Sequence, residues 1–338
     1  MKTEYLTMVE LERAAQWIRR GETVAFQTET VYGLGADATN EGAVKKIYQA
    51  KGRPSDNPLI IHIARREQAL EYCGEISQQA QALMDAFWPG PLTLILKAQK
   101  NKLAPSVTAG LETVGIRLPA TEAAQKLIEM AGVPIAAPSA NTSGRPSPTT
   151  AAHVLHDLDG KIAAVVDSGP AEVGVESTIV DLSAGPLPVI LRPGGISREA
   201  VEEVIGPVSI SRTDLKKSDI AKAPGMKYQH YAPDEDLFII DGPKEYWREK
   251  IVELNEQGQQ VGIIAHEDLI ADLSPLVQAR YSLGEKGDAE TAAARLFDGL
   301  RYFEKTNVTV ILAEAYLEEG LGLAYMNRLD KAADHRYL

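Results

Sequence analysis

The sequence predicts an α/β protein. Short runs of β-branched residues alternate along the chain with amphipathic segments whose apolar residues recur every three to four positions. The runs at 178–182 and 189–192 are joined only by a turn, so we expect a mixed sheet rather than a purely parallel one. A chain of 338 residues with 44% hydrophobic content is long enough to form two domains.

The first predicted domain covers residues 1–208 and contains a twisted mixed sheet. Strands are expected from β-branched composition at 23–26, 59–63, 92–97, 114–118, 163–167, 178–182 and 189–192. Helices are expected from apolar spacing at 9–20, 43–51, 77–87, 123–131, 150–158 and 198–205. Ser77 and Ser197 begin two of these segments and are suited to cap the first helical turn.

A linker is predicted over residues 209–235, where the chain is polar and weakly patterned and then interrupted by prolines. The remainder, 236–338, is predicted to be a smaller Rossmann-like domain with a parallel sheet. Its expected elements alternate along the chain as strand 237–240, helix 246–256, strand 261–265, helix 289–303 and strand 308–312. It carries no Gly-x-Gly-x-x-Gly motif and no phosphate loop, so we expect no nucleotide site of its own.

The composition argues against several classes of protein. A net charge of -12 disfavours a broad nucleic-acid-binding surface, although segment 212–231 has more basic than acidic residues and is where an anion is expected. A single cysteine, Cys73, excludes a disulfide framework and a multi-cysteine zinc site. The first residues lack the long apolar run that a signal peptide needs, and no apolar run approaches the ~20 residues that cross a bilayer. We therefore expect a cytoplasmic protein without a membrane partner.

Segment 51–59, with the sequence Lys-Gly-Arg-Pro-Ser-Asp-Asn-Pro-Leu, is the first candidate anion-binding site. Lys51 and Arg53 lie two positions apart, so in an extended segment both side chains point to one side and can hold one phosphate chain. The alternative is a solvated surface loop, which is the usual reading of two neighbouring cations considered alone.

Two other segments are rich in polar side chains. Segment 27–35 follows the first expected strand and includes Gly33 and Gly35. It is either a ligand-binding edge of the sheet, with room for close backbone approach, or a capped turn. Segment 136–147 is dense in hydroxyl and amide groups, and its small side chains leave room for a ligand.

Single residues add further candidates. Thr113 and Arg117 lie four apart on an expected strand and project from one face, where an inward arginine needs an anionic partner. Arg192 and the glycines after it precede a helix, which suits either a phosphate or a simple turn. His62 shares a strand face with Ile60, and a histidine in such a position is usually a hydrogen-bonded core residue. The sequence has no zinc-like cluster and no Gly-x-Ser-x-Gly motif, so covalent nucleophilic catalysis is unsupported.

Taken in order, these segments resemble a known family. The matching motifs are Thr28-x-Thr30-x-Tyr32-Gly33-Leu34, Lys51-x-Arg53-x-x-x-Asn57-Pro58-Leu59, Ala137-Pro138-Ser139-Ala140-Asn141, Ser177-Thr178 and Arg192-x-Gly194. Over residues 8–207 their order and spacing resemble the YrdC-like domain. With the linker sequence Pro224-Gly225-Met226-Lys227-Tyr228-x-His230-Tyr231-Ala232-Pro233, the whole chain resembles the long, two-domain form of the L-threonylcarbamoyl-AMP synthase family. Gln27 stands where that family usually has proline, which affects only the local turn.

The resemblance implies an enzyme, a nucleotidyltransferase. The reaction it implies converts L-threonine, bicarbonate and ATP into L-threonylcarbamoyl-AMP, pyrophosphate and water, with a magnesium ion accompanying ATP. It also implies a partner, the transferase complex that uses the product to make threonylcarbamoyladenosine beside the anticodon of tRNA.

The resemblance further implies two sets of site residues. The L-threonine set is Thr30, His62, Arg117, Ala137 and Ser177, with Arg117 as the partner of the carboxylate. The ATP set is Lys51, Arg53, Asn57, Thr113, Ser139, Asn141, Ser147, Arg192, Tyr228 and Tyr231. Lys51 and Arg53 are the expected catalytic residues, because they would offset charge on the leaving pyrophosphate. No resident metal site is expected, and no general base is evident.

The linker is expected to act as a lid that excludes water from the labile adenylate, with Lys227 and Tyr228 or Tyr231 against the nucleotide. Two other functions stay open from sequence. An RNA-binding module would bind tRNA in a salt-dependent way, although the acidic composition leaves room only for weak RNA binding. A carbamoyltransferase that forms carbamoyl-adenylate would use carbamoyl phosphate, but such proteins carry acylphosphatase and zinc-finger-like segments that this chain lacks.

Overall fold

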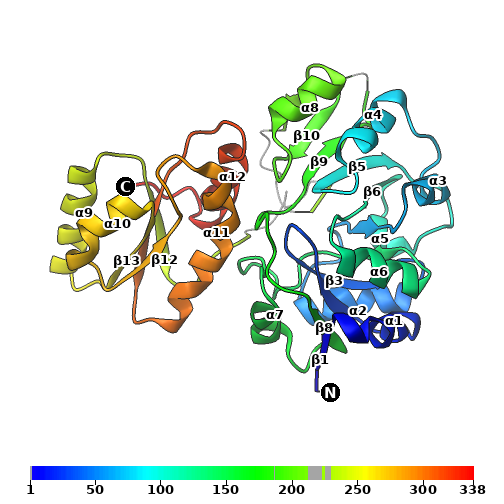
Figure 1. The fold of residues 1–338 in the computed structure, drawn as a ribbon, viewed down its shortest axis with the longest axis horizontal. Helices are drawn as coiled ribbons and strands as arrows, with labels where there is room; N and C mark the ends of the chain where they lie inside the picture. The colour runs from blue at the N-terminus through cyan, green and yellow to red at the C-terminus, as the bar shows by residue number, and fades with distance from the viewer. Residues whose placement is uncertain (1, 186, 212–222, 225–229) are drawn as a thin grey trace. The chain divides into compact units, whose positions relative to one another are not determined.

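In the computed structural model the chain forms two compact units (Figure 1). The structure describes residues 2–185, 187–211, 223–224 and 230–338. The first unit comprises Met1–Ser143 and Ser147–Tyr228, and the second comprises Gly144–Pro146 and Gln229–Leu338. Each unit is built around its own β-sheet.

The first unit contains an eleven-stranded sheet. In spatial order its strands are β1 (Glu4–Thr7), β8 (Ala164–Asp167), β2 (Val24–Gln27), β3 (Tyr32–Asp37), β7 (Ile135–Ala136), β4 (Ile60–His62), β6 (Thr113–Arg117), β5 (Leu92–Lys97), β9 (Thr178–Asp181), β10 (Val189–Arg192) and β11 (Ser209–Ile210). The sheet is mixed, since β4 runs parallel to β6 whereas β5 runs antiparallel to it.

Helices connect these strands. They are α1 (Leu11–Arg19), α2 (Glu41–Lys51), α3 (Ala69–Tyr72), α4 (Gln78–Phe87), α5 (Pro105–Thr108), α6 (Glu122–Ala131), α7 (Ala151–Leu158) and α8 (Arg198–Ile205), with 3-10 turns η1 (Met8–Glu10) and η2 (Arg66–Gln68). The Ser77 hydroxyl accepts a hydrogen bond from the Ala80 amide at 3.2 Å, and Ser197 accepts one from the Ala200 amide at 3.2 Å. Both expected N-caps are confirmed, and each satisfies an amide that a helix start leaves without an internal partner.

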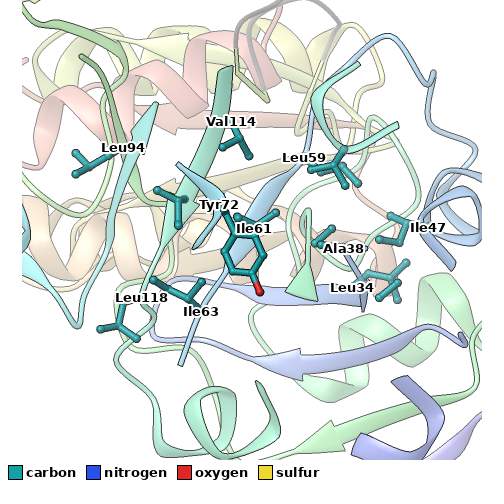
Figure 2. Packing of buried hydrophobic residues seen from close by; sticks show 14 of the residues in the cluster. Leu34, Ala38, Ile47, Leu59, Ile61, Ile63, Tyr72, Leu94, Val114 and Leu118 are labelled. Atoms are coloured by element: carbon teal, nitrogen blue, oxygen red, sulfur yellow. The ribbon is translucent and has the colours of Figure 1, made fainter. Parts of the chain in front are cut away.

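One face of the large sheet is covered by the main hydrophobic core. Ile61 of β4, Leu94 of β5 and Ile116 of β6 all enter it, together with apolar residues from α2, α4 and α7. Figure 2 shows this packing around Ile61, Leu94 and Val114. Because side chains alternate along a strand, the residues between these core positions project from the opposite face.

The opposite face is covered in two ways. Over β1, β8, β2 and β3, α1 and α6 pack their apolar residues against Phe26 and Val166. Over β4, β5 and β9 the face carries a smaller apolar cluster of Ile60, Ile95 and Ile179, joined by Ala223 from the linker. This second half of the face is where the candidate site lies.

The second unit contains a four-stranded parallel sheet. Its strands in spatial order are β12 (Asp236–Ile240), β15 (Val310–Glu314), β13 (Val261–Ala265) and β14 (Ala279–Ser282). Its helices are α9 (Lys244–Glu256), α10 (Glu267–Leu273), α11 (Ala289–Tyr302) and α12 (Gly322–Ala332), with 3-10 turns η3 (Ser274–Leu276) and η4 (Phe303–Lys305). Helices α9 and α10 lie on one side of this sheet and α11 and α12 on the other (Figure 1). Every residue of β13 is buried, as expected for a strand covered on both faces.

The predicted fold class is confirmed, since a mixed sheet and a separate parallel sheet are both present. The bounds of β5, β10, β13 and α8 match the prediction, and most other expected elements differ by one or two residues. The elements not predicted from the sequence are β1, β3, β7, β11, α3 and α5 in the first unit and β14, α10 and α12 in the second. Among the described residues, no helix is both long and apolar enough to cross a membrane.

Candidate active site

The strand register brings several expected site residues to one face. In the parallel pair β4 and β6, His62 lies opposite Arg117 and Ile60 lies opposite Gly115. Thr113 and Arg117 share this face with Gly115, because they are separated by even numbers of residues on one strand. A Cβ atom at Gly115 would lie 3.2 Å from both Ile60 and Ile95, so the sheet face between Thr113 and Arg117 is closely packed with these two side chains.

Arg117 is the centre of the L-threonine set. The side chain is 5% exposed, and its Nη1 donates a hydrogen bond to the Thr30 hydroxyl at 3.0 Å. Nη2 donates to Glu29 Oε1 at 2.6 Å, and Nε donates to the main-chain oxygen of Gly90 at 3.2 Å. The inward arginine therefore has the anionic partner that its burial requires, and that partner is Glu29.

The Thr30 hydroxyl is held by a short chain of hydrogen bonds. Thr28 Oγ1 donates to the main-chain oxygen of Val31 at 2.6 Å and lies 2.8 Å from Thr30 Oγ1. Since the Thr28 proton is already used, Thr30 donates to Thr28 and accepts from Arg117. The orientation of the Thr30 hydroxyl is thus set before any substrate is present.

His62 is fully buried beside Arg117. Burial disfavours the charged imidazolium, the Arg117 charge opposes it further, and together they lower the pKa of His62 from 6.5 to about 3. Its ring meets that of Phe26 edge to face, with the centroids 6.3 Å apart. Nδ1 is buried and has no hydrogen-bond partner among the described residues. A neutral ring with an unused nitrogen at this position is suited to a polar substrate atom.

Lys51 and the loop after β7 form the first part of the ATP set. Asn40 caps α2, and the helix ends at Gly52 with a positive φ of 63°, which places Lys51 in the last turn. Its ammonium donates to the main-chain oxygens of Ser139 and Asn141 and to Asn141 Oδ1. The Ser139 hydroxyl donates to the same Oδ1 at 2.6 Å. Three expected ATP residues therefore form one hydrogen-bonded group.

Asn57 and Arg53 lie in the loop that connects α2 to β4. Arg53 Nη2 donates to the main-chain oxygens of Asn57 and Pro58 at 3.4 and 3.3 Å. The Asn57 side chain is 1% exposed, and neither its amide nitrogen nor its oxygen has a partner among the described residues. An unpaired buried amide is costly in a folded protein, so this one marks a place where a ligand is expected.

Ser177 directly precedes β9, and Arg192 is the last residue of the neighbouring strand β10. Arg192 Nη2 donates to the main-chain oxygen of Ser177 at 3.0 Å and to its hydroxyl at 3.3 Å, and that hydroxyl lies 2.8 Å from Thr93 Oγ1. A Cβ atom at Gly194 would lie 2.3 Å from the main-chain oxygen of Glu176, so the backbone after Arg192 passes directly over this segment. Backbone packing explains Gly194 without a phosphate at the helix start.

Ser147, Ala137 and Thr113 are other described members of the two sets. The Ser147 hydroxyl is fully buried and donates to Glu176 Oε1 at 2.6 Å. The Ala137 amide donates to the main-chain oxygen of Ile60 at 3.0 Å, which keeps Ala137 beside β4. Thr113 opens β6 at the end opposite Arg117.

The linker prediction falls mostly outside the described residues, including Lys227 and Tyr228. Of the described linker residues in the first unit, Ala223 is fully buried against Ile60 and Ile95, and the main-chain oxygen of Pro224 accepts from Arg192 Nη1 at 3.4 Å. Tyr231 belongs to the second unit, where its ring centroid lies 5.0 Å from that of Phe297 and 5.9 Å from the guanidinium of Arg328.

Comparison with known proteins identifies the family. Residues 16–194 match the family described as Telomere recombination, and residues 196–334 match the Threonylcarbamoyl-AMP synthase, C-terminal domain. The chain is 50% identical to the threonylcarbamoyl-AMP synthase of Bacillus subtilis, over 97% of this chain and 94% of the relative. The chain belongs to the threonylcarbamoyl-AMP synthase family.

Another full-length relative and a solved structure are also similar to this chain. The threonylcarbamoyl-AMP synthase of Pyrococcus abyssi is 51% identical, over 96% of this chain and 94% of the relative. The crystal structure of the Pyrococcus abyssi Sua5 protein complexed with L-threonine superposes with a TM-score of 0.92 at 46% identity, covering 100% of this chain and 99% of that one. The predicted resemblance to the two-domain form of the threonylcarbamoyl-AMP synthase family is confirmed.

Part of segment 27–35 differs from the expected ligand-binding edge or capped turn. Residues 28–31, which include Thr30, connect β2 to β3, but Tyr32–Asp37 forms β3 and pairs antiparallel with β2. A Cβ atom at Gly35 would lie 2.6 Å from Ile135 and 2.7 Å from Phe26. Gly35 therefore makes room for core side chains rather than for a ligand.

Three polar residues that support the site of this threonylcarbamoyl-AMP synthase family member were not predicted from the sequence. Glu29 pairs with Arg117, Thr93 contacts Ser177, and Glu176 accepts from Ser147. The need of an inward arginine for an anion was a usable signal for Glu29. No comparable signal existed for Thr93 and Glu176, because their partners Ser177 and Ser147 carry no charge that would require a particular kind of partner.

Proposed function

We propose that this chain synthesises L-threonylcarbamoyl-AMP from L-threonine, bicarbonate and ATP, with release of pyrophosphate and water. The observation that carries the proposal is a buried sheet face on which Arg117 and His62 lie side by side, with unused polar atoms on His62 and on Asn57. The names of the full-length relatives and the L-threonine complex of the Pyrococcus abyssi protein support the same conclusion.

The two substrate sets separate along β4 and β6. His62 and Arg117 lie where these parallel strands end, whereas Asn57 and Thr113 lie where they begin. Four residues of strand span roughly 13 Å, which is long enough to separate a threonyl group from a nucleotide. We assign L-threonine to the end with His62 and Arg117 and ATP to the end with Asn57 and Thr113.

The proposed chemistry needs positioning and charge neutralisation. The threonine amine attacks the carbon of bicarbonate, a C–N bond forms, and water is lost to leave a carbamate. A carbamate oxygen then attacks the α-phosphorus of ATP, while the bond to the oxygen bridging the α- and β-phosphorus breaks and pyrophosphate leaves. Arg117 would hold the threonine carboxylate, and Lys51 and Arg53 would offset the charge of the phosphates.

Magnesium enters this proposal as part of the ATP substrate. Within residues 2–185, 187–211, 223–224 and 230–338, no group of three or more His, Cys, Asp or Glu side chains is arranged to hold a metal ion. A magnesium ion bound by substrate phosphates and water requires no such cage. The residues of this chain that would act on that complex are the cations Lys51 and Arg53.

The proposed product also implies a partner. A mixed anhydride of a carbamate and AMP is reactive, so it must be consumed by an enzyme that transfers the threonylcarbamoyl group. We propose that this enzyme is the transferase complex that modifies adenosine beside the anticodon of tRNA, and that this chain itself binds RNA at most weakly.

Pyrophosphate release tests the function. Purified protein is given ATP with L-threonine and bicarbonate, each present or omitted, and strict dependence on both is the expected result. Activity that needs carbamoyl phosphate instead would move the chain to the carbamoyltransferases. Salt-dependent tRNA binding without ATP turnover under any condition would favour an RNA-binding module.

Truncation tests the proposed lid. A chain that ends before Ser209 lacks the linker and the second domain, and we expect it to release less pyrophosphate than the full chain. Ala223 and Pro224 support this expectation, because both contact residues of the site face. Undiminished turnover by the truncated chain would reject the lid.

A further inference from the structure

Glu29 contacts two segments that border the L-threonine end of the site. Its side chain is 7% exposed, and its two oxygens have different partners. Oε1 accepts from Arg117 Nη2 at 2.6 Å, and Oε2 accepts from the main-chain amide of Ala120 at 3.0 Å. The main-chain oxygen of Glu29 accepts from the Val173 amide at 2.8 Å. Both the backbone and the carboxylate of Glu29 are therefore fixed in place.

The hydrogen bonds of Arg117 leave a defined part of its guanidinium available. An arginine carries five N–H donors, one on Nε and two on each terminal nitrogen. The bonds to Gly90, Thr30 and Glu29 use one donor on each of the three nitrogens. One N–H therefore remains on each terminal nitrogen, without a partner among the described residues. Two donors on adjacent nitrogens match the two oxygens of one carboxylate.

Glu29 also supplies the counter-charge of Arg117. Burying a guanidinium without a counter-charge is strongly unfavourable, and here the Glu29 carboxylate, 2.6 Å from Arg117 Nη2, offsets the cost of removing the guanidinium from water. Because Oε2 is tied to the Ala120 amide, the carboxylate cannot follow Arg117 if the arginine turns. Glu29 thus holds the guanidinium at one angle as well as neutralising it.

We propose that Glu29 is a positioning residue for substrate: it fixes Arg117 so that the two remaining N–H groups face the carboxylate of the amino acid. This inference rests on the proposed function and names the residue that makes the site select an α-carboxylate. Glu29 itself need not touch L-threonine. Its effect is therefore confined to the amino acid, and the binding of ATP is independent of it.

Steady-state kinetics of three variants test the proposal. Glu29→Ala removes both anchors, and we expect the KM for L-threonine to rise at least ~10-fold while the KM for ATP stays within ~2-fold. Glu29→Asp keeps the charge and recovers part of the loss. The matched control is Glu41→Ala, because Glu41 likewise accepts from a main-chain amide and a side chain, both of Ser106, at 3.1 and 2.6 Å. We expect the control to keep both KM values.

L-threoninol, which has a hydroxymethyl group in place of the carboxylate, provides a second test. Calorimetric titration measures the affinities of L-threonine and L-threoninol for each protein. In the unmodified protein L-threonine binds more tightly, and in Glu29→Ala the ratio of the two affinities falls at least ~10-fold. Thermal unfolding of each variant separates lost stability from lost recognition.

The outcomes distinguish the inference from the function on which it rests. If Glu29→Ala unfolds at a lower temperature but keeps the KM for L-threonine and the affinity ratio, Glu29 is only structural and the inference is wrong. A higher affinity for L-threonine in Glu29→Ala would also overturn the inference, because Glu29 would then merely repel the substrate. If the unmodified protein shows no turnover that depends on L-threonine, the proposed function fails, whatever the variants do.

Discussion

Lys51 and Asn141 are 90 positions apart in sequence, yet the ammonium of Lys51 donates to both oxygens of Asn141, at 2.6 Å for the main chain and 3.3 Å for the side chain. Lys51 is 2% exposed, so this contact is closed to solvent. The residue that would neutralise the phosphates therefore also holds the loop that would bind the nucleotide. Both roles depend on one compact cation with donors that point in several directions.

Substitution of Lys51 is expected to remove activity by two routes. Lys51→Met leaves the oxygens of Ser139 and Asn141 without their donor and removes the charge, so we expect kcat/KM for ATP to fall at least ~100-fold. Lys51→Arg should not rescue it, because a planar guanidinium does not fit among oxygens arranged around an ammonium. Pyrophosphate release measures the effect. Lys45→Met, at an exposed position of the same helix, is the control, and full activity of Lys51→Arg would contradict the argument.

Asn57 provides a prediction in which stability and activity move in opposite directions. Its buried amide has no partner among the described residues, so Asn57→Leu removes two unsatisfied polar atoms at similar volume. We expect the free energy of unfolding to stay equal or to rise by about 1 kcal/mol, while the KM for ATP rises at least ~10-fold. Urea unfolding and substrate kinetics measure the two quantities. A destabilised variant with an unchanged KM for ATP would mean that Asn57 serves the fold alone.

Much of the fold was predictable from local pattern, and the failures have physical causes. Strands such as β5 have β-branched or apolar residues at nearly every position, which is a strong local signal. β3 was missed because Gly33 and Gly35 weaken strand propensity, and the reason for Gly35, the nearby Phe26 and Ile135 side chains, lies in other strands. β7 and β11 have two residues each, too few for any periodicity.

The site residues were predictable because family motifs carry them, but their partners were not. Arg117 was expected to bind a carboxylate, whereas its first anion is Glu29, 88 positions away in sequence. Similarly, Ser177 was expected without its contact to Thr93, which exists only because β5 and β9 are neighbours. Contacts of this kind follow from strand order, which one sequence does not reveal.

The backbone at Gly194 tests whether close packing positions Ser177 and Arg192. A Cβ atom there would lie 2.3 Å from the main-chain oxygen of Glu176 and 2.4 Å from the carbonyl carbon of Ser177, and neither backbone atom can move alone. We expect Gly194→Ala to lower the free energy of unfolding by about 1–3 kcal/mol and to raise the KM for L-threonine. Gly74→Ala is the control, because a Cβ atom at Gly74 meets nothing within 4 Å. Equal behaviour of the two variants would refute the packing argument.

His62 makes stability depend on pH in a direction that its burial determines. The pKa is about 3 in the folded protein and 6.5 in the unfolded chain, because burial and then Arg117 oppose the charged ring. Between these two values the unfolded chain binds a proton that the folded protein does not. His62 therefore makes the protein less stable as the pH falls from 6.5 towards 3, by at most ~1.4 kcal/mol per pH unit.

Substitution isolates this contribution. His62→Gln has no such group, so its stability relative to the unmodified protein should increase steadily as the pH is lowered from 7 to 4.5, measured by urea unfolding. Activity should show no transition from His62 above pH 6, because the ring is already neutral there. If His62→Gln and the unmodified protein lose stability in parallel as the pH is lowered, His62 is not buried in the neutral form. The proposed role of its unused Nδ1 as a contact for L-threonine would then be lost as well.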